Sequence, residues 1–309
     1  MGPTNYKWVY VAAFLVGSLL FVRIACASDI LPNIPMPTMG GKQFWSDTFY
    51  QKGWRIQKNA LTNHFRLLDG NGVRQAWGSY EHCKKSFDGL RDKQSSKDHL
   101  VILVHGILRS GGSFTAIKDD LKTAGYEVVT ISYASTRLTL EEHADNLDLL
   151  LNRLEGFKQV SFVTHSMGGL VVRETLSRDS NWRARIELGR IVMIAPPNQG
   201  SAIANTMKDH LSFQLLYGVS GQQLITAHAA TMPNIDGEFG IIAGGTSDDR
   251  GFNPWIEGDD DGVLSVAETH LDGARDFLVI KALHSTLLGR SETSKSVRGF
   301  LERGQFTFE

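Results

Sequence analysis

The fold is decided by the stretch Val163-Thr164-His165-Ser166-Met167-Gly168-Gly169, which lies between an apolar run and the helical pattern Leu-Val-Val-Arg. A sharp turn from strand to helix strains the backbone of its central residue and crowds the neighbouring backbones, so it requires small residues on both sides. Gly168 meets this requirement, whereas Thr164 stands where the common G-x-S-x-G pattern has glycine. The pattern predicts that the turn presents Ser166 as a nucleophile. The alternative is that Ser166 merely caps a helix after a buried strand.

Continuous apolar runs, separated by helical patterns, extend from residue 100 towards the C-terminus. The runs occupy residues 100–104, 128–131, 160–163, 191–194, 241–243 and 277–280. Runs without alternation are typical of strands that are buried on both faces. Between them, segments such as 140–154 keep one apolar stripe at helical spacing. This order predicts an α/β fold with a mostly parallel central sheet flanked by helices.

The segment before residue 99 follows a different pattern. Residues 54–56 and 64–68 alternate as half-buried strands do, and a turn leads to a third such stretch at 73–77. A helix capped by Ser79 is then predicted to run to about Arg91. We therefore expect an N-terminal extension, residues 28–98, in which an antiparallel hairpin and a helix join the sheet. The catalytic domain would follow over residues 99–309.

Residues 1–27 are typical of a targeting segment, with a basic residue, the apolar run 8–22 and an Ala-Cys-Ala cleavage pattern. We expect cleavage before Ser28 and export to the periplasm or the medium. The alternative is an uncleaved anchor over residues 8–27 that associates the protein with a membrane. Arg23 would then extend its charge to the interface between lipid and water.

The composition of the 309-residue chain limits the classes of function. Hydrophobic residues make up 42%, enough for a large core in one α/β domain or in two smaller ones. Lys and Arg total 32 against 33 Asp and Glu, so the charge indicates no nucleic-acid partner and favours a neutral or apolar substrate. Cleavage would remove Cys26 and leave only Cys83, which excludes an internal disulfide and the usual cysteine zinc sites.

The sequence Val104-His105-Gly106-Ile107-Leu108 follows the first buried run and leads into a glycine-rich approach to a helix. This position allows the backbone N–H of Ile107 to point at a developing oxyanion. Met167, directly after the nucleophile, would supply a second N–H. We expect the imidazole of His105 to hydrogen-bond within its own loop, and we do not assign it as the catalytic base.

The base is expected late in the chain if the order is serine, acid, histidine. His284 comes just past the last apolar run, at a strand end of the kind where reactive groups lie in a parallel sheet. The alternatives fit less well. His165 lies in the turn itself, and His210, His228 and His270 follow no such run. We therefore assign His284 as the base.

Three consecutive aspartates, Asp259, Asp260 and Asp261, are the candidates for the acid. Asp261 directly precedes Gly262, in a loop that should deliver a carboxylate to the second nitrogen of His284. That carboxylate would fix the imidazole tautomer and stabilise the imidazolium. We choose Asp261, while a solvated acidic loop and a calcium site stay open as alternatives for the run.

The chain resembles the α/β-hydrolase superfamily, and within it bacterial lipase- and esterase-like proteins, over about residues 100–300. The matching stretches are Val104-His105-Gly106, the motif at 164–169, the sequence Ala-Pro-Pro-Asn-Gln-Gly-Ser at 195–201, Asp261-Gly262 and Ala282-Leu283-His284. The resemblance implies the α/β-hydrolase fold, with Ser166 as nucleophile, Asp261 as acid and His284 as base. It also implies that Ile107 and Met167 are the oxyanion donors, and that no cofactor or metal is needed.

The resemblance implies a serine hydrolase that cleaves carboxylic esters of lipid or acyl substrates through an acyl-enzyme intermediate. A small insertion between Ser201 and Phe239, expected after the sixth buried-strand region, is either a lid over an acyl pocket or an ordinary helix with a buried stripe. A thioesterase or acyltransferase would use the same triad. A non-catalytic binding protein of the cell envelope would keep the fold without the reaction.

Overall fold

The computed structural model describes residues 36–37, 42–89, 97–248 and 250–306. Its central sheet has six strands, all parallel, in the order β11-β10-β9-β8-β6-β7. The strands are β6 (His99–Val104), β7 (Glu127–Thr130), β8 (Gln159–His165), β9 (Glu187–Ile194), β10 (Phe239–Gly245) and β11 (Asp276–Lys281). Each corresponds to one of the six apolar runs, so the predicted parallel sheet is confirmed.

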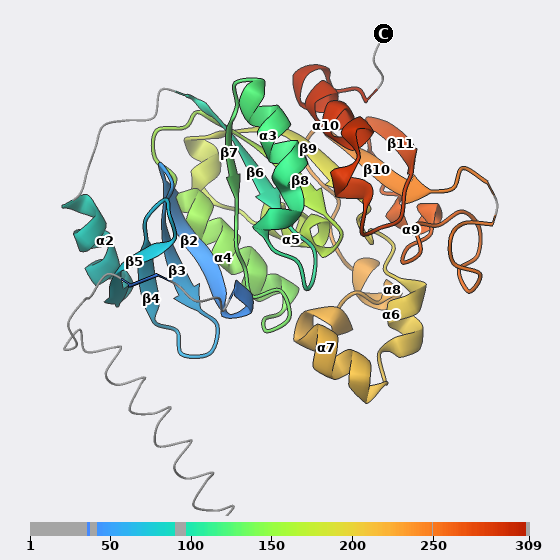
Figure 1. Ribbon diagram of the computed structural model, residues 1–309, viewed down its shortest axis with the longest axis horizontal. Coiled ribbons are helices and arrows are strands. Elements are labelled where there is room, and N and C mark those ends of the chain that lie inside the picture. The colour runs from blue at the N-terminus through green and yellow to red at the C-terminus, as the bar shows by residue number, and fades with distance from the viewer. Residues whose placement is uncertain (1–35, 38–41, 90–96, 249, 307–309) are drawn as a thin grey trace, which may run out of the picture.

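Helices cover both faces of this sheet (Figure 1). α3 (Thr115–Thr123) and α10 (Ser291–Arg303) pack on one face, and α4 (Leu140–Asn152) and α5 (Met167–Leu176) pack on the other. Each face has its own apolar core, because successive side chains of a strand point to opposite faces. Ile102 and Leu103, neighbours in β6, accordingly belong to different cores. The apolar stripe predicted for residues 140–154 is buried in one of them.

The strand order reverses next to β6. β7 and β8 follow β6 in the chain but lie on opposite sides of it. Such a reversal leaves a crevice at the carboxyl ends of the two strands where the order switches. The loop that begins at His105 and the turn at Ser166 both start at this edge.

The N-terminal segment forms an antiparallel sheet of five strands in the order β1-β5-β4-β3-β2. Its strands are β1 (Met36–Pro37), β2 (Trp45–Gln51), β3 (Trp54–Asn59), β4 (Phe65–Leu68) and β5 (Val73–Gly78). The predicted hairpin is present and is part of this larger sheet. The predicted helix is α2 (Tyr80–Asp88), capped by the Ser79 hydroxyl, which accepts the His82 N–H at 3.1 Å. Residues 90–91, where the helix was expected to end, lie outside the described residues.

The N-terminal sheet does not join the parallel sheet, which differs from the expectation. Its edge strand β2 contacts the segment that follows β7 through one backbone hydrogen bond. In this bond the Asp47 N–H donates to the Ser132 C=O (2.8 Å). The Asp47 carboxylate accepts the Ser132 N–H (2.7 Å), and β2 has an irregular register between Asp47 and Phe49. Because a side chain takes the N–H of Ser132 and the bulge bends the strand, the ladder does not continue.

The predicted insertion lies between β9 and β10. It consists of the short helices α6 (Ala202–Met207), α7 (Leu211–Gln222) and α8 (Thr226–Ala229). It follows the fourth strand of the parallel sheet in chain order, so its expected position after the sixth buried-strand region was wrong. α7 bends at Gly218, where φ 60° and ψ −152° interrupt the helical geometry. The remaining short elements are α9 (Val266–Thr269) and four 3-10 helices at Lys42–Phe44, Gly111–Phe114, Asn181–Ala184 and Leu287–Gly289.

The targeting segment predicted for residues 1–27 lies outside the described residues. Within the described ranges, no helix combines the length and the apolar character needed to cross a bilayer. Cleavage, anchoring and the domain boundaries after residues 27 and 98 stay predictions.

Candidate active site

Ser166 lies at the carboxyl end of β8, directly before the first turn of α5. Its backbone has φ 53° and ψ −129°, a conformation that residues with a side chain rarely adopt. Two backbone hydrogen bonds hold it: Ser166 N–H donates to Ile194 C=O (2.8 Å), and Ser166 C=O accepts from Gly169 N–H (2.9 Å). Strain of this kind costs about 1–3 kcal/mol and is concentrated at functional sites. The sharp turn expected around Ser166 is thus present.

Close packing explains the small residues of this turn. A Cβ on Gly168 would lie 2.3 Å from the carbonyl oxygen of Val104, well inside van der Waals contact. Thr164, which replaces the usual glycine, is fully buried, and its hydroxyl faces Val192 C=O at 3.5 Å. A Cβ on Gly169 would contact that hydroxyl at 3.4 Å. The turn therefore accommodates the Thr164 side chain because the neighbouring Gly169 has none.

The first two of the three consecutive aspartates close loops. Asp259 accepts hydrogen bonds from the backbone N–H groups of residues 246–247 at 2.7 and 3.0 Å. Asp260 is fully buried and accepts from the N–H groups of Asn253 (3.0 Å) and Gly262 (2.6 Å). Both carboxylates therefore have backbone partners within their own loop. The described part of the chain contains no group of three or more metal-binding side chains.

Asp261 differs from its neighbours because one of its oxygens faces His284. Its Oδ1 accepts the N–H groups of Val263 (3.0 Å) and Leu264 (2.8 Å), while its Oδ2 accepts the Nδ1–H of His284 at 2.7 Å. Gly262, with φ 90°, lets the chain turn back so that these contacts form together. The structure thus brings Asp261 and His284 together, and it directs the two preceding carboxylates elsewhere.

The contact with Asp261 sets the tautomer of His284. Since Nδ1 donates to the carboxylate, Nε2 of the neutral ring keeps its lone pair and can accept a proton. His284 follows β11, and it borders the same cavity as Ser166. The described structure has no hydrogen bond between the Ser166 hydroxyl and the His284 ring. Such bonds are often long before a substrate is present.

The two expected backbone donors lie at the same edge of the sheet. Ile107 borders the cavity in the loop after β6, and Met167 is the first residue of α5. Neither N–H has a hydrogen-bond partner among the described residues. Leu108 (φ 57°) and Ala195 (φ 45°) share the positive φ of Ser166. Three strained residues therefore gather at the ends of β6, β8 and β9.

The histidines near the turn are held neutral by burial. His105 Nδ1 donates to Gly106 C=O (2.8 Å), as expected, and its ring stacks on Tyr133 with centroids 4.3 Å apart. Burial lowers the pKa of His105 to about 4. Burial and the neighbouring His284 hold the pKa of His165 well below its usual value. Both rings are therefore poor proton acceptors near neutral pH.

The cavity beside Ser166 has a volume of about 550 Å³ and two unlike walls. The strand-end loops supply the wall that contains the polar groups, Ser166, Asp261 and His284, beside apolar side chains such as Leu264 and Leu283. The insertion supplies an apolar wall of Ile203, Ala204, Phe213, Tyr217 and Leu224. α7 therefore lines a pocket and does not only cover the core, which favours the pocket-covering alternative for the insertion.

Exposed apolar side chains surround this cavity. On α7, Leu211, Leu215 and Leu216 are 69%, 76% and 56% exposed, while Phe213 and Tyr217 of the same helix stack on each other at the pocket. Further exposed apolar side chains line the cavity or lie in the adjoining loop: Leu108, Val263, Leu283, Phe252 and Trp255. Away from the cavity and α7, the described residues expose only two other large apolar side chains, Leu61 and Leu149.

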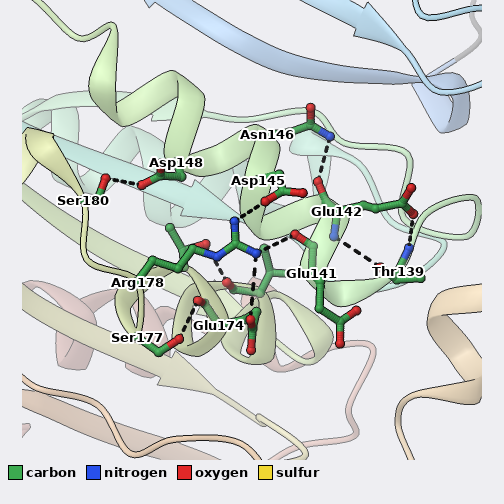
Figure 2. A network of polar contacts seen from close by, with 12 residues as sticks. Thr139, Glu141, Glu142, Asp145, Asn146, Asp148, Glu174, Ser177, Arg178 and Ser180 are labelled. Atoms are coloured by element: carbon green, nitrogen blue, oxygen red, sulfur yellow. Dashed lines mark hydrogen bonds and ion pairs between the residues drawn. The ribbon is translucent and has the colours of Figure 1, made fainter.

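A polar network connects the end of α5 to the insertion. Figure 2 shows Arg178, just past α5, reaching Asp145 and the backbone carbonyl of Glu141 on α4. The Glu141 carboxylate in turn accepts from Gln223 Nε2 at 2.9 Å, and Gln223 Oε1 accepts the Leu140 N–H at 2.6 Å. The C-terminal end of α7 is therefore held against α4, whereas its first turns carry the exposed leucines.

Sequence reasoning missed Arg173 of α5, which supports the loop after β9. Arg173 is buried, and its guanidinium donates to the carbonyl oxygens of Asn198, Met232 and Pro233 at 3.1–3.3 Å. Burial lowers its pKa to about 10. Asn198 lies in the Ala-Pro-Pro-Asn stretch quoted above, but no spacing rule connects that asparagine to an arginine earlier in the chain.

Comparison with known proteins is consistent with this fold. The structure resembles the mature form of the Bacillus licheniformis lipase BlEst2 with a TM-score of 0.54 at 15% identity, covering 69% of this chain and 95% of that one. It resembles the propeptide form with a TM-score of 0.55 at 16% identity, covering 71% of this chain and 52% of the other. For the metagenomic carboxyl esterase MGS0156, the TM-score is 0.50 at 18% identity, covering 64% and 68%.

At these identities the likeness establishes the α/β-hydrolase fold. No curated protein matches the chain. A family model described as "Domain of unknown function (DUF7379)" matches residues 71–236, more than half of the chain. The chain therefore belongs to the family described as Domain of unknown function (DUF7379), and it has the α/β-hydrolase fold.

Proposed function

We propose that the protein is a serine hydrolase that cleaves carboxylic esters. The observation that carries this proposal is the hydrogen bond of 2.7 Å between His284 Nδ1 and Asp261 Oδ2, at a cavity that also contains the strained Ser166. A nucleophile, a base and a group that orients the base are the elements that acyl transfer requires. In this proposal Ser166, His284 and Asp261 take these three roles.

The reaction would proceed through an acyl-enzyme. Ser166 Oγ attacks the ester carbonyl carbon as its proton passes to His284 Nε2, and the N–H groups of Ile107 and Met167 stabilise the oxyanion. The bond between carbonyl carbon and alcohol oxygen breaks, and His284 returns the proton to the leaving alcohol. Water then attacks the acyl carbon and gives its proton to His284. The bond between that carbon and Ser166 Oγ breaks, His284 returns the proton to Oγ, and the carboxylic acid leaves.

We further propose that the natural substrates are esters with long acyl groups, such as lipids. The apolar wall formed by Phe213, Tyr217 and Leu224 is suited to an acyl chain. The exposed leucines of α7 are suited to an amphiphilic or aggregated substrate, since large exposed apolar patches mark binding surfaces. Export, or anchoring through residues 8–27, would bring such an enzyme close to membrane lipids. Fractionation of cells that express the full chain tests whether the protein is exported or stays with the membrane.

The proposal is tested by hydrolysis of p-nitrophenyl esters from acetate to palmitate, with Ser166→Ala as the paired variant. Turnover by the wild type that disappears in Ser166→Ala, with an optimum at medium or long chains, is the expected result. The matching thioesters separate ester from thioester cleavage. A folded wild type without activity on either series would instead support the binding protein that keeps the fold without the reaction.

A further inference from the structure

Arg109 borders the cavity near Ser166 and is the only lysine or arginine among its lining residues. It follows the oxyanion loop directly, three residues after Gly106. Its positive charge is close enough to His165 to contribute to the low pKa of that buried imidazole. The strand-end wall of the cavity therefore carries a permanent cation in addition to the proposed catalytic groups.

The guanidinium of Arg109 has no ion-pair or hydrogen-bond partner within the described ranges, 36–37, 42–89, 97–248 and 250–306. The one carboxylate that lines the cavity is Asp261, and its oxygens are taken by His284 and by two backbone N–H groups. A cation left without a counter-charge in a partly enclosed pocket attracts an anion more strongly than one on an open surface.

The main chain of Arg109 is fixed on both sides. Its N–H donates to Gly106 C=O (3.2 Å), and its C=O accepts from Gln43 Nε2 (3.3 Å). Gln43 Oε1 accepts from the Ser135 hydroxyl (2.9 Å), and Ser135 Oγ accepts the N–H of Leu108 (3.1 Å). These hydrogen bonds hold Leu108 at its positive φ. They also fix the backbone of Arg109, from which its side chain extends.

We propose that Arg109 selects substrates that carry an anionic group, a phosphate or a carboxylate, within reach of the ester being cleaved. This inference rests on the proposed ester hydrolysis at Ser166 and deepens it. Arginine is suited to the task because its planar guanidinium binds the oxygens of phosphate or carboxylate through two parallel hydrogen bonds. The total charge of the chain gives no sign of such a preference, because it does not show one unpaired cation in a pocket.

The test compares kcat/KM for pairs of esters that differ only in the anion. The first pair is 1-dodecanoylglycerol and its 3-phosphate, with the anion on the alcohol side. The second is p-nitrophenyl butyrate and p-nitrophenyl hemiglutarate, with a carboxylate on the acyl side. The pair in which the wild type prefers the anion identifies the side that Arg109 contacts.

In at least one pair, the wild type should prefer the anionic ester, and Arg109→Gln should lower that preference at least tenfold. Arg109→Lys should restore part of it, since the ammonium keeps the charge but loses the two-bond geometry. Arg137→Gln is the matched control, because Arg137 lies over the Phe44 ring (5.1 Å) and does not border the cavity. A wild type without preference in either pair, or an equal loss on both members in Arg109→Gln, would overturn the assignment.

A binding measurement keeps this test separate from the proposed reaction. Dodecyl phosphate and 1-O-dodecylglycerol cannot be cleaved as carboxylic esters, so their affinities for the Ser166→Ala protein do not depend on turnover. Adding Arg109→Gln should weaken binding of dodecyl phosphate about tenfold more than binding of the ether, with the thermal midpoint showing that both proteins are folded. Equal affinities with and without Arg109 would reject the anion site even if ester hydrolysis is observed.

Discussion

The two walls of the cavity are built by opposite means. On the strand-end wall, backbone and side-chain hydrogen bonds hold Ser166, Asp261 and His284 in defined positions. On the insertion wall, α7 offers apolar side chains to the pocket on one side and to solvent on the other, and it bends at Gly218. The first wall is specified by polar geometry and the second by apolar contact.

This difference separates reaction from substrate choice. Proton transfer and oxyanion stabilisation require positions accurate to fractions of an ångström, which only rigid elements and saturated hydrogen bonds provide. Binding of an acyl chain depends mainly on the apolar surface area that is removed from water, and little on the exact positions of the side chains. Changes at the strand-end wall should therefore act on turnover and folding, and changes on α7 should act on the range of substrates.

The largest effect on turnover is expected at Asp261, the third of the three consecutive aspartates. Asp261→Asn should lower kcat by roughly ten thousandfold, the loss typical of a triad histidine that loses control of its tautomer. Asp259→Asn and Asp260→Asn are isosteric controls whose carboxylates accept hydrogen bonds only from nearby loop residues, so kcat should stay within about threefold once folding is verified. A large loss of kcat in either control, with Asp261→Asn still active, would mean that the acid is wrongly assigned.

The next effect concerns packing at the turn. Gly168→Ala should lower the free energy of unfolding by roughly 3 kcal/mol, because its Cβ would lie 2.3 Å from the Val104 carbonyl oxygen. Gly289→Ala is the matched control, since no atom lies within 4 Å of its Cβ position, and should change stability by less than about 0.5 kcal/mol. Urea unfolding followed by circular dichroism measures both. Equal stability of the two variants would contradict the close contact.

Acid should destabilise the fold through two buried histidines, His105 after β6 and His143 on α4. Burial lowers the pKa of His105 to about 4 and that of His143 to about 3, against an ordinary value of 6.5. The unfolded chain then binds protons that the folded protein refuses, so stability is complete above pH 6.5 and is lost as the pH falls towards 4. Each histidine contributes up to about 1.4 kcal/mol per pH unit.

Thermal midpoints between pH 7 and pH 4.5 measure this loss. The variant His143→Gln, which has no titrating ring, should show a smaller decrease over the same interval than the wild type. A midpoint that stays constant down to pH 4.5 in the wild type would show that these rings are not held neutral in the folded protein.

The smallest effect on stability is expected on α7. Leu215→Gln and Leu216→Gln replace exposed side chains and should change the free energy of unfolding by less than about 0.5 kcal/mol. They should nevertheless lower kcat/KM several-fold more for a long-chain ester in micelles than for p-nitrophenyl acetate in solution. Leu61→Gln, an exposed leucine far from the cavity in the N-terminal sheet region, is the control. Losses of equal size on both substrates would argue against a substrate-binding surface on α7.

Local sequence signals predicted the parallel sheet well. The six strands are continuous apolar runs because both of their faces are buried, and this pattern differs from that of the loops and helices around them. β2 was missed because it buries Ser46, Asp47 and Thr48 together, so its sequence has no apolar alternation. The buried Asp47 is compensated by Arg55 and Gln57, and such partners are not visible from spacing.

The candidate site could be predicted where one short segment determines the geometry. The Asp-Gly pattern indicated the turn that directs Asp261 to His284, and the Ser-Met-Gly-Gly pattern indicated the strained turn at Ser166. Gln43, Ser135 and Arg109 were missed because their hydrogen bonds join residues 66 and 92 positions apart. Contacts of this kind depend on how the N-terminal sheet packs against the part that contains the parallel sheet, and no single segment encodes that packing.

The most direct test of the account is to locate the serine that a fluorophosphonate probe modifies. The probe reacts covalently with activated serine nucleophiles, and peptide mass spectrometry identifies the modified residue. The account predicts an adduct on the peptide that contains Ser166, with a much lower labelling rate in Asp261→Asn and none in Ser166→Ala. A folded wild type that is not labelled, or an adduct on Ser201 or Ser285 of the same cavity, would contradict it.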